Sequence, residues 1–295
     1  MKLKTARILM IASMGIFGTI GLLVRNIAMP SAQIAMCRAV LASVMLGVYL
    51  LVTKQRIGFR KIGKELPLLL LSGAAMGINW ILLFEAYKYT TVSLATLSYY
   101  FAPVLVTLVC PILFREKMGA RQWICFAMST VGIVLLTGIG ETGTADTHLK
   151  GILFGLGAAA FYASVILLNK FIKNVGGIHR TFLQFVAAVV VLVPYVLISG
   201  DVSFSALDAS GLACLLVVGI VHTGITYCMY FSALRELPGQ KVAILSYIDP
   251  LVAVLVSVVI LRETMQPLQI VGGLLILGFT LWNEIAPVKK KEKVA

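Results

Sequence analysis

Four ionisable side chains interrupt the apolar stretches of this sequence, at positions from which a lipid bilayer would exclude them. Arg38, Glu85, His222 and Asp249 each lie within a stretch long enough to cross a membrane. A charge near the bilayer centre costs roughly 2.5–3.5 kcal/mol on insertion scales, so such groups persist where they are paired, hydrated or used. These residue types can hold a carboxylate, hold an ammonium group or carry a proton, and they predict a binding site between membrane helices.

Asp249 lies near the middle of its stretch and directly precedes Pro250. Because proline has no N–H group, the carbonyl of Ser246 loses its helical partner. A carboxylate beside a free carbonyl indicates a cation or proton site; the alternative is a kinked helix in which Asp249 bonds to a neighbour. Pro103 frees the carbonyl of Tyr99 in the same way, but no acid precedes it.

Arg38 lies about six residues inside its apolar stretch, and Glu85 lies near the same predicted membrane surface. Two interpretations are open: the pair neutralise each other, or they contact a substrate. His222 shares a helix face with Thr226. An imidazole changes charge near neutral pH and would suit proton coupling, whereas a buried histidine with satisfied hydrogen bonds is the structural alternative.

The elements that position these groups are membrane helices. Of the 295 residues, 60% are hydrophobic and 13% are charged, and the mean hydropathy is +0.98, which is too apolar for one soluble core. Helices that cross the hydrocarbon layer are expected at residues 7–28, 32–53, 66–88, 91–113, 119–138, 150–172, 180–199, 209–233, 239–261 and 267–286. The five cysteines lack metal-ligand spacing, and neither a metal nor a cofactor is expected.

The sequence states one membrane pattern twice, 147 residues apart: the segment YYFAPVLVTLVCPILFREKM at Tyr99–Met118 returns as SYIDPLVAVLVSVVILRETM at Ser246–Met265. The two copies divide the ten helices into two fives, at residues 1–140 and 150–288, followed by a basic tail at 289–295. Because five is odd, the second copy must enter the membrane from the opposite side, which gives an inverted repeat. The predicted fold class is all-α integral membrane, with ten transmembrane helices as two inverted five-helix repeats around a central cavity.

The lysines and arginines predict the orientation. If both termini are cytoplasmic, 20 of the 25 basic residues fall on the cytoplasmic side, four fall opposite and Arg38 lies within a helix. This distribution follows the positive-inside rule for a multi-pass protein of the cytoplasmic membrane. The net charge of +13 is therefore mostly a topology signal, and binding to nucleic acid is not expected.

The repeat aligns Asn79 and Trp80 with Thr226 and Tyr227, so both copies place polar and aromatic groups at one depth. Tyrosine and tryptophan rings can stack on a solute or hold a cation; packing is the alternative. The candidate substrate-contacting residues are Arg38, Asn79, Trp80, Tyr99, Tyr100, His222, Thr226, Tyr227 and Tyr247, the charge or coupling candidates are Glu85 and Asp249, and the helix-break candidates are Pro103 and Pro250.

These features resemble the EamA-like branch of the drug/metabolite transporter superfamily over essentially the whole chain. The resemblance is carried by the two inverted fives, Arg38, the AYKYTTVSLATLSYYFAP segment at Ala86–Pro103, the Arg-Glu pair after each proline-containing helix, and Gln269–Gly272. It implies a basket of predicted helices one to four and six to nine around a cavity, with the fifth and tenth as supports. It further implies transport of small metabolites by alternating access.

We therefore expect a secondary transporter, a monomer or a dimer, that exports an amino acid or a similar zwitterion, with proton coupling as an option. The alternative is an efflux transporter for drugs and other organic cations, which Asp249, Glu85 and the aromatic rings suit and Arg38 opposes. An enzyme is not expected, because no HExxH motif or aspartyl pair is present, and no ATP-binding GxxxxGK[ST] loop is present either.

Overall fold

The computed structural model describes residues 3–55, 63, 65–114, 118–136, 145–175, 177–199, 207–234, 236–237, 242 and 245–285, and within these residues it contains helices and no strands. In chain order the helices are α1 (Leu3–Gly18), α2 (Ile20–Arg25), α3 (Ser31–Val52), α5 (Leu66–Tyr89), α6 (Val92–Tyr99), α7 (Ala102–Phe114), α8 (Ala120–Leu136), α9 (Ala145–Phe171), α10 (Gly177–Ser199), α11 (Ala209–Leu216), the π-helix η1 (Val217–Ile225), α12 (Thr226–Leu234), α14 (Ile248–Leu255), the π-helix η2 (Val256–Ile260) and α15 (Pro267–Ile285). The predicted basic tail and the first copy of the Arg-Glu pair, Arg115 and Glu116, lie outside the described residues.

Within the part of the chain that the structure describes, seven helical segments are long and apolar enough to cross a membrane: Leu3–Arg25, Ser31–Val52, Leu66–Tyr89, Val92–Cys110, His148–Phe171, Gly177–Ser199 and Ala209–Ala233. Three shorter apolar helices, Ala120–Leu136, Ile248–Ile260 and Pro267–Asn283, occupy the other predicted positions. The chain is therefore an all-helical, multi-pass membrane protein, and the ten-helix inverted repeat stays a prediction.

The outer surface of the helices carries large apolar side chains. Leu51 on α3, Ile198 on α10 and Leu274 on α15 are 78%, 85% and 67% exposed, and many other valines, leucines and isoleucines are exposed in the same way. Water-soluble proteins rarely expose contiguous apolar surface of this extent. These faces are suited to contact with lipid, so the polar groups gathered inside the bundle are the ones that need a functional explanation.

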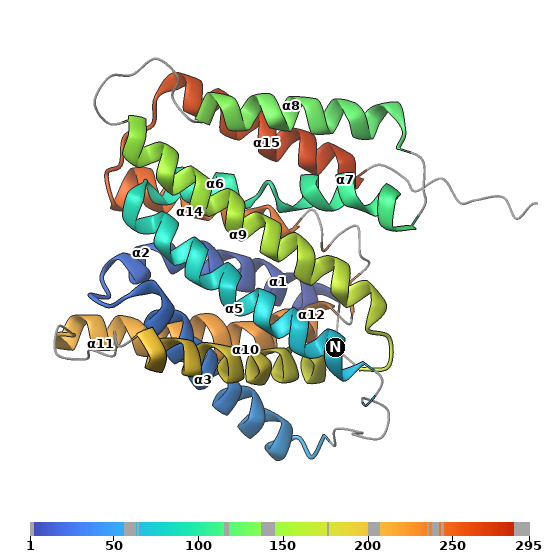
Figure 1. Ribbon diagram of the computed structural model, residues 1–295, viewed down its shortest axis with the longest axis vertical. Coiled ribbons are helices and arrows are strands. Elements are labelled where there is room, and N and C mark those ends of the chain that lie inside the picture. Colours follow the sequence, from blue (N-terminus) through green and yellow to red (C-terminus); the bar gives the residue numbers. More distant parts are fainter. Residues whose placement is uncertain are drawn as a thin grey trace, which may run out of the picture.

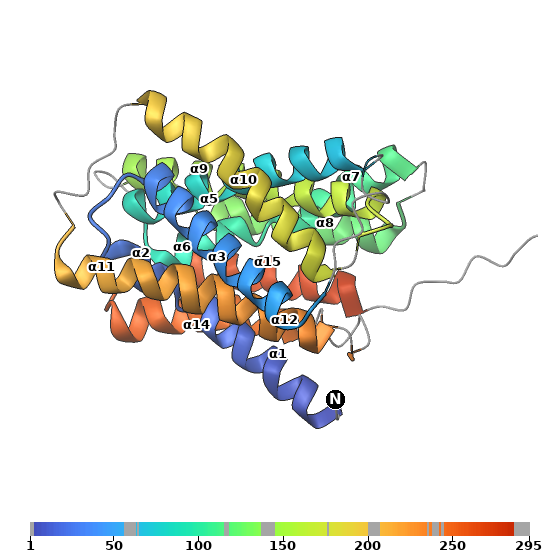
Figure 2. The ribbon, with the colours of Figure 1, turned by 90° about the horizontal axis from the view of Figure 1, so that it is seen from below.

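The helices close a ring. Along it, α1 packs on α14, α14 on α6, α6 and α7 on α9, α9 on α5, α5 on α10, α10 on α3, α3 on η1, and α12 on α1. Figure 2 shows α3 between α10 and the chain of α11, η1 and α12. The pair α8 and α15 pack on each other at one edge of the molecule (Figure 1).

Several predicted single helices are interrupted. The stretch 7–28 divides into α1 and α2 at Thr19, and the stretch 91–113 divides into α6 and α7 between Tyr99 and Ala102. Pro103 and Pro250 lie in the first turns of α7 and α14, so the helix breaks come just before the prolines. The physical reason is that a proline in the first turn of a helix removes no intrahelical hydrogen bond.

The π-helices η1 and η2 were not expected from the sequence. Within η1, the hydroxyl of Thr223 donates to the carbonyl of Val218 at 2.9 Å, five residues earlier. Just after η1, the hydroxyl of Thr226 donates to the carbonyl of Val221 at 2.7 Å with the same spacing. Such widened turns are rare and occur frequently at functional sites.

Candidate functional site

Arg38, on α3, is buried inside the ring, with an exposed fraction of 4%. Its Nε donates to the Thr223 hydroxyl at 2.7 Å. Its guanidinium carbon lies 4.4 Å from the ring centre of Trp80 and 5.6 Å from that of Phe84, distances at which a cation is attracted to an aromatic face. No carboxylate pairs with Arg38 among the residues that the structure describes. A buried cation without an anionic partner is suited to bind an anionic group of a solute.

Asp249, in the first turn of α14, accepts a hydrogen bond from the Tyr100 hydroxyl at 2.7 Å. The same hydroxyl lies 3.5 Å from the carbonyl oxygen of Ser246, just before α14. In the described part of the chain, neither of the two ion pairs involves Asp249. Tyr100 thus joins the break between α6 and α7 to the start of α14.

The approach of α1 to this acid depends on a glycine. A Cβ atom added to Gly18 would lie 2.5 Å from the backbone oxygen of Asp249 and 2.7 Å from the Cβ of Val252. Any larger residue would force α1 away from α14, since real Cβ atoms do not approach that closely. Gly18 therefore brings the α1–α2 break close to Asp249.

Arg38 belongs to a group of aromatic side chains, here called the Arg38 cluster: Trp80, Phe185, Tyr227 and Phe17. The ring centres of Trp80 and Phe185 are 5.3 Å apart, those of Phe185 and Tyr227 5.3 Å, and those of Phe17 and Tyr227 5.1 Å. These residues come from α5, α10, α12 and α1. Arg38 therefore lies at one end of a continuous aromatic surface.

Asp249 belongs to a second group, here called the Asp249 cluster: Tyr100, Tyr99, Tyr162 and Tyr247. The ring centres of Tyr99 and Tyr162 are 5.2 Å apart, those of Tyr99 and Tyr100 5.9 Å, and those of Tyr100 and Tyr247 6.4 Å. Tyr99 ends α6 and Tyr162 comes from α9. The acid thus lies among tyrosines, whose rings combine an apolar face with a polar hydroxyl.

The two clusters are close neighbours. Tyr99 of the Asp249 cluster and Tyr227 of the Arg38 cluster pack against the same buried core, which includes Trp80 and Phe185. The ring of helices therefore surrounds one buried cation and one partly buried acid, separated by aromatic side chains. A solute that carries a positive and a negative group matches this arrangement.

His222, in η1, connects to the break between α1 and α2. Its Nε2 lies 2.8 Å from the Thr19 hydroxyl, which in turn donates to the carbonyl of Ile16 at 2.8 Å. Its Nδ1 lies 3.4 Å from the carbonyl of Val217. A hydroxyl and a neutral imidazole each have one proton to donate, so the donor across the contact between Thr19 and Nε2 is set by the tautomer of His222. This chain joins the two helices at the point where each is irregular.

Two of the predicted substrate contacts have partners in the protein backbone. The Asn79 side chain is buried and donates to the carbonyl of Ala158 at 2.6 Å, which joins α5 to α9. The Thr226 hydroxyl, at the start of α12, donates to the carbonyl of Val221 in η1. Glu85 accepts from the Ser31 hydroxyl at 2.6 Å and lies 3.3 Å from the Lys88 ammonium, so the structure does not pair it with Arg38.

Sequence analysis missed Phe17, Thr19, Tyr162, Phe185 and Thr223. The three aromatic residues have no distinguishing sequence signal, because an aromatic residue in an apolar helix looks the same whether it faces lipid or a partner ring. Thr223 directly follows His222 within an apolar stretch, and this polar pair is a signal that could have identified it.

An all-helical membrane fold that encloses buried charges and aromatic side chains is the architecture of a membrane transport protein. The chain belongs to the EamA-like transporter family, whose model matches residues 4–138 and again residues 149–283. This membership confirms the resemblance seen in the sequence.

Relatives of the chain carry transporter names. The chain is 32% identical over 257 residues to the uncharacterized transporter YxxF of Bacillus subtilis, with 87% of this chain and 82% of the relative covered. It is 30% identical to an uncharacterized transporter of Archaeoglobus fulgidus, with 68% and 70% covered. A crystal structure at 16% identity has a TM-score of 0.63 over 95% of this chain and 96% of that one, which shows similarity of fold.

Proposed function

We propose that this protein is a secondary transporter that exports a small zwitterionic metabolite, such as an amino acid, across the cytoplasmic membrane. The observation that carries the proposal is the pair of opposite charges inside the ring. Within the described residues Arg38 has no acidic partner and Asp249 has no basic one, yet tyrosines from both clusters pack against one buried core.

Each part of a zwitterion has a partner in this arrangement. The carboxylate of the solute binds Arg38, whose planar guanidinium suits bidentate contacts to carboxylates. The ammonium group binds Asp249 and the faces of the neighbouring tyrosines. The apolar part of the solute contacts the Arg38 cluster. The proposal leaves Glu85 in its ion pair with Lys88.

The order of helices around the ring supports alternating access. In the predicted repeat, α1 and α2 together correspond to α9, and α3 corresponds to α10. Helix α5 corresponds to the run from α11 to α12, and α6 and α7 together correspond to α14 and η2. If every segment is exchanged with its counterpart, each contact of the ring maps onto another contact of the same ring. Two halves related in this way can rock about a site between them. The proposal places both termini in the cytoplasm, following the distribution of lysine and arginine.

Proton coupling through Asp249 is the driving force that we propose. The acid lies beside the break between α6 and α7 and bonds to Tyr100 within that break. A change of its charge therefore acts on an irregular segment of the backbone, and a regular helix interior would be harder to move.

The test is counterflow in proteoliposomes that contain the purified protein. Vesicles are loaded with one unlabelled amino acid, nucleobase or organic cation at a time, and the uptake of labelled amino acids is followed. We expect stimulation by internal amino acids, lost in Arg38→Gln and retained in the control Lys88→Gln, which removes a cation that is 43% exposed. Counterflow that Arg38→Gln leaves unchanged would contradict the proposed role of the buried cation.

Export of organic cations is the second candidate, and the concentration of tyrosines around Asp249 favours it. The unpaired Arg38 opposes it, since a buried cation repels a cationic solute. If organic cations alone exchange in the same panel, this second candidate replaces the first.

A further inference from the structure

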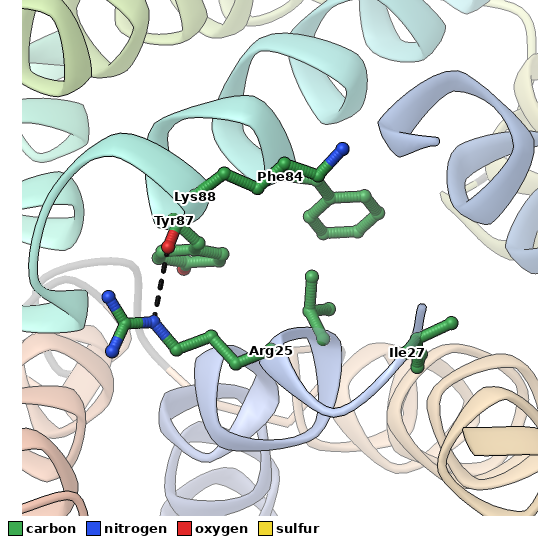
Figure 3. Close-up of a pocket in the computed structure, with 6 residues that line it drawn as sticks. Arg25, Ile27, Phe84, Tyr87 and Lys88 are labelled. Atoms are coloured by element: carbon green, nitrogen blue, oxygen red, sulfur yellow. Dashed lines mark hydrogen bonds between the residues drawn. The ribbon is translucent and has the colours of Figure 1, made fainter. Parts of the chain in front are cut away.

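A pocket of about 310 Å³ lies away from the two clusters, at the junction of α2 and the C-terminal end of α5. It is lined by Val24, Arg25, Ile27, Phe84, Tyr87 and Lys88. Figure 3 shows Arg25 and Ile27 on one side of the pocket and Phe84, Tyr87 and Lys88 on the other. In the predicted topology this end of the molecule faces outward.

One side chain that lines the pocket, Phe84, also approaches Arg38. Phe84 borders the pocket and is itself fully buried. Its ring centre lies 5.6 Å from the guanidinium carbon of Arg38. Phe84 is therefore the side chain that stands between the pocket and the buried cation.

Arg25 ties this end of the molecule together. Its Nε donates to the carbonyl of Tyr87 at 3.1 Å (Figure 3), and its Nη2 donates to the carbonyl of Thr90 at 2.6 Å. Its Nη1 forms an ion pair with Glu263, which follows η2. One guanidinium thus links α2, the end of α5 and the segment that follows α14.

Glu263 extends the same connection. Its second carboxylate oxygen accepts from the backbone N–H of Val92, the first residue of α6, at 2.9 Å, and from the Ser257 hydroxyl. The residue before it, Arg262, has a φ of 54°. This left-handed conformation is unfavourable for a side chain with a Cβ atom, so the turn that presents Glu263 is held against strain.

We propose that Arg25 and Glu263 form the gate that closes this side of the transport pathway, and that Phe84 is the plug between the pocket and Arg38. The inference rests on the proposed transport function. The linked elements include α2, α6 and the end of η2, which flank the irregular segments around the site. Breaking the ion pair frees α2 and the end of α5 from α6 and η2, which stay joined through Glu263, and movement of Phe84 then joins the pocket to the Arg38 cluster.

The experiment measures access to the site by cysteine labelling. In a protein whose five native cysteines are replaced by serine, Thr223→Cys places a thiol beside Arg38, at a position that is fully buried. A membrane-impermeant cationic methanethiosulfonate is added to one face of the membrane. That face is identified by Thr264→Cys, an exposed position next to Glu263.

We expect Glu263→Gln to raise the labelling rate of the reporter from this face by about tenfold, because loss of a charge-assisted hydrogen bond shifts an equilibrium by about that factor. Arg25→Gln should have the same effect, and the double variant should label no faster than either single variant, since both changes break one contact. If Glu263→Gln does not fold, Arg25→Gln carries the test.

The matched control is Glu85→Gln. It removes an ion pair at the same end of the molecule, but Glu85 and Lys88 are three residues apart on one helix, so this pair does not hold separate elements together. The glutamine oxygen can still accept from the Ser31 hydroxyl of α3. If labelling stays slow in both gate variants, or rises equally in the control, the proposal that Arg25 and Glu263 form a gate is wrong. Labelling needs no transported solute, so a failure of the gate is distinguishable from a failure of the proposed function in counterflow.

Discussion

Thr223→Val tests whether the buried cation is held in place by the π-helix. The Thr223 hydroxyl accepts from Arg38 Nε at 2.7 Å and donates to the carbonyl of Val218 at 2.9 Å. Valine has nearly the same shape and can do neither. A hydrogen bond to a charged group contributes about 1.5–3 kcal/mol and a neutral one about 1 kcal/mol, so the free energy of unfolding should fall by about 2.5–4 kcal/mol.

Thr226→Val is the matched control for this change. Thr226 is also fully buried, and its hydroxyl also donates to a carbonyl five residues earlier, but it makes no bond to Arg38. Its replacement should cost about 1 kcal/mol. The difference between the two variants therefore isolates the bond to the guanidinium.

The measurement is thermal unfolding in detergent, followed with a thiol-reactive fluorescent dye that reports exposure of buried cysteines such as Cys125. A loss of 1 kcal/mol lowers the midpoint by about 2–4 °C in chains of 150–250 residues. A double-mutant cycle with Arg38→Met should give a coupling energy of about 1.5–3 kcal/mol between Arg38 and Thr223. Equal destabilisation by the two threonine variants, or a coupling energy near zero, would refute the reasoning.

Three further predictions concern other parts of the fold. Asp249→Asn should abolish flux driven by a pH gradient and should weaken solute counterflow in proteoliposomes without abolishing it, because the tyrosine faces still hold the ammonium group; pH-driven flux that persists would count against proton coupling. Tyr100→Phe should weaken the same coupling, because Asp249 loses its donor. Gly132→Ala should separate α8 from α15 and destabilise the protein by about 1–3 kcal/mol, because a Cβ atom there would lie 2.7 Å from a backbone oxygen of α15. Gly278→Ala is the control in the same thermal assay and should be tolerated, because a Cβ atom there would have no atom within 4 Å. Glu65→Ala should cost about 1.5–3 kcal/mol, since its carboxylate accepts from two backbone amides after α9; an unchanged unfolding midpoint would contradict this.

Sequence alone anticipated the class of fold and the residues that carry charge into it. Apolar stretches depend on local composition, so the sequence predicts the order of the helices along the chain. The boundaries of α3, α5 and α10 agree with the predicted 32–53, 66–88 and 180–199 within three residues. The three shorter helices show the limit of this approach. Composition places an apolar segment but does not fix how many of its residues enter a regular helix.

Contacts between side chains that are far apart along the chain could not be predicted from the sequence. The interpretation that Glu85 neutralises Arg38 rested on a shared depth in the membrane, but depth does not specify which helices are neighbours. In the structure α3 packs on η1, so Arg38 meets Thr223, 185 residues away. Glu85 finds Lys88 on its own helix instead.

The amino-acid sequence by itself determined that the chain is a helical membrane protein, that a pattern repeats at 147 residues, and that Arg38 and Asp249 place charges within apolar stretches. These properties follow from hydropathy and spacing, which are local. The tertiary structure decided that Arg25 meets Glu263 across 238 residues, that Tyr100 meets Asp249 across 149, and that the helices break beside the site. The physical reason is that each of these contacts depends on the packing order of the ring, which many sequences of equal hydropathy would not share.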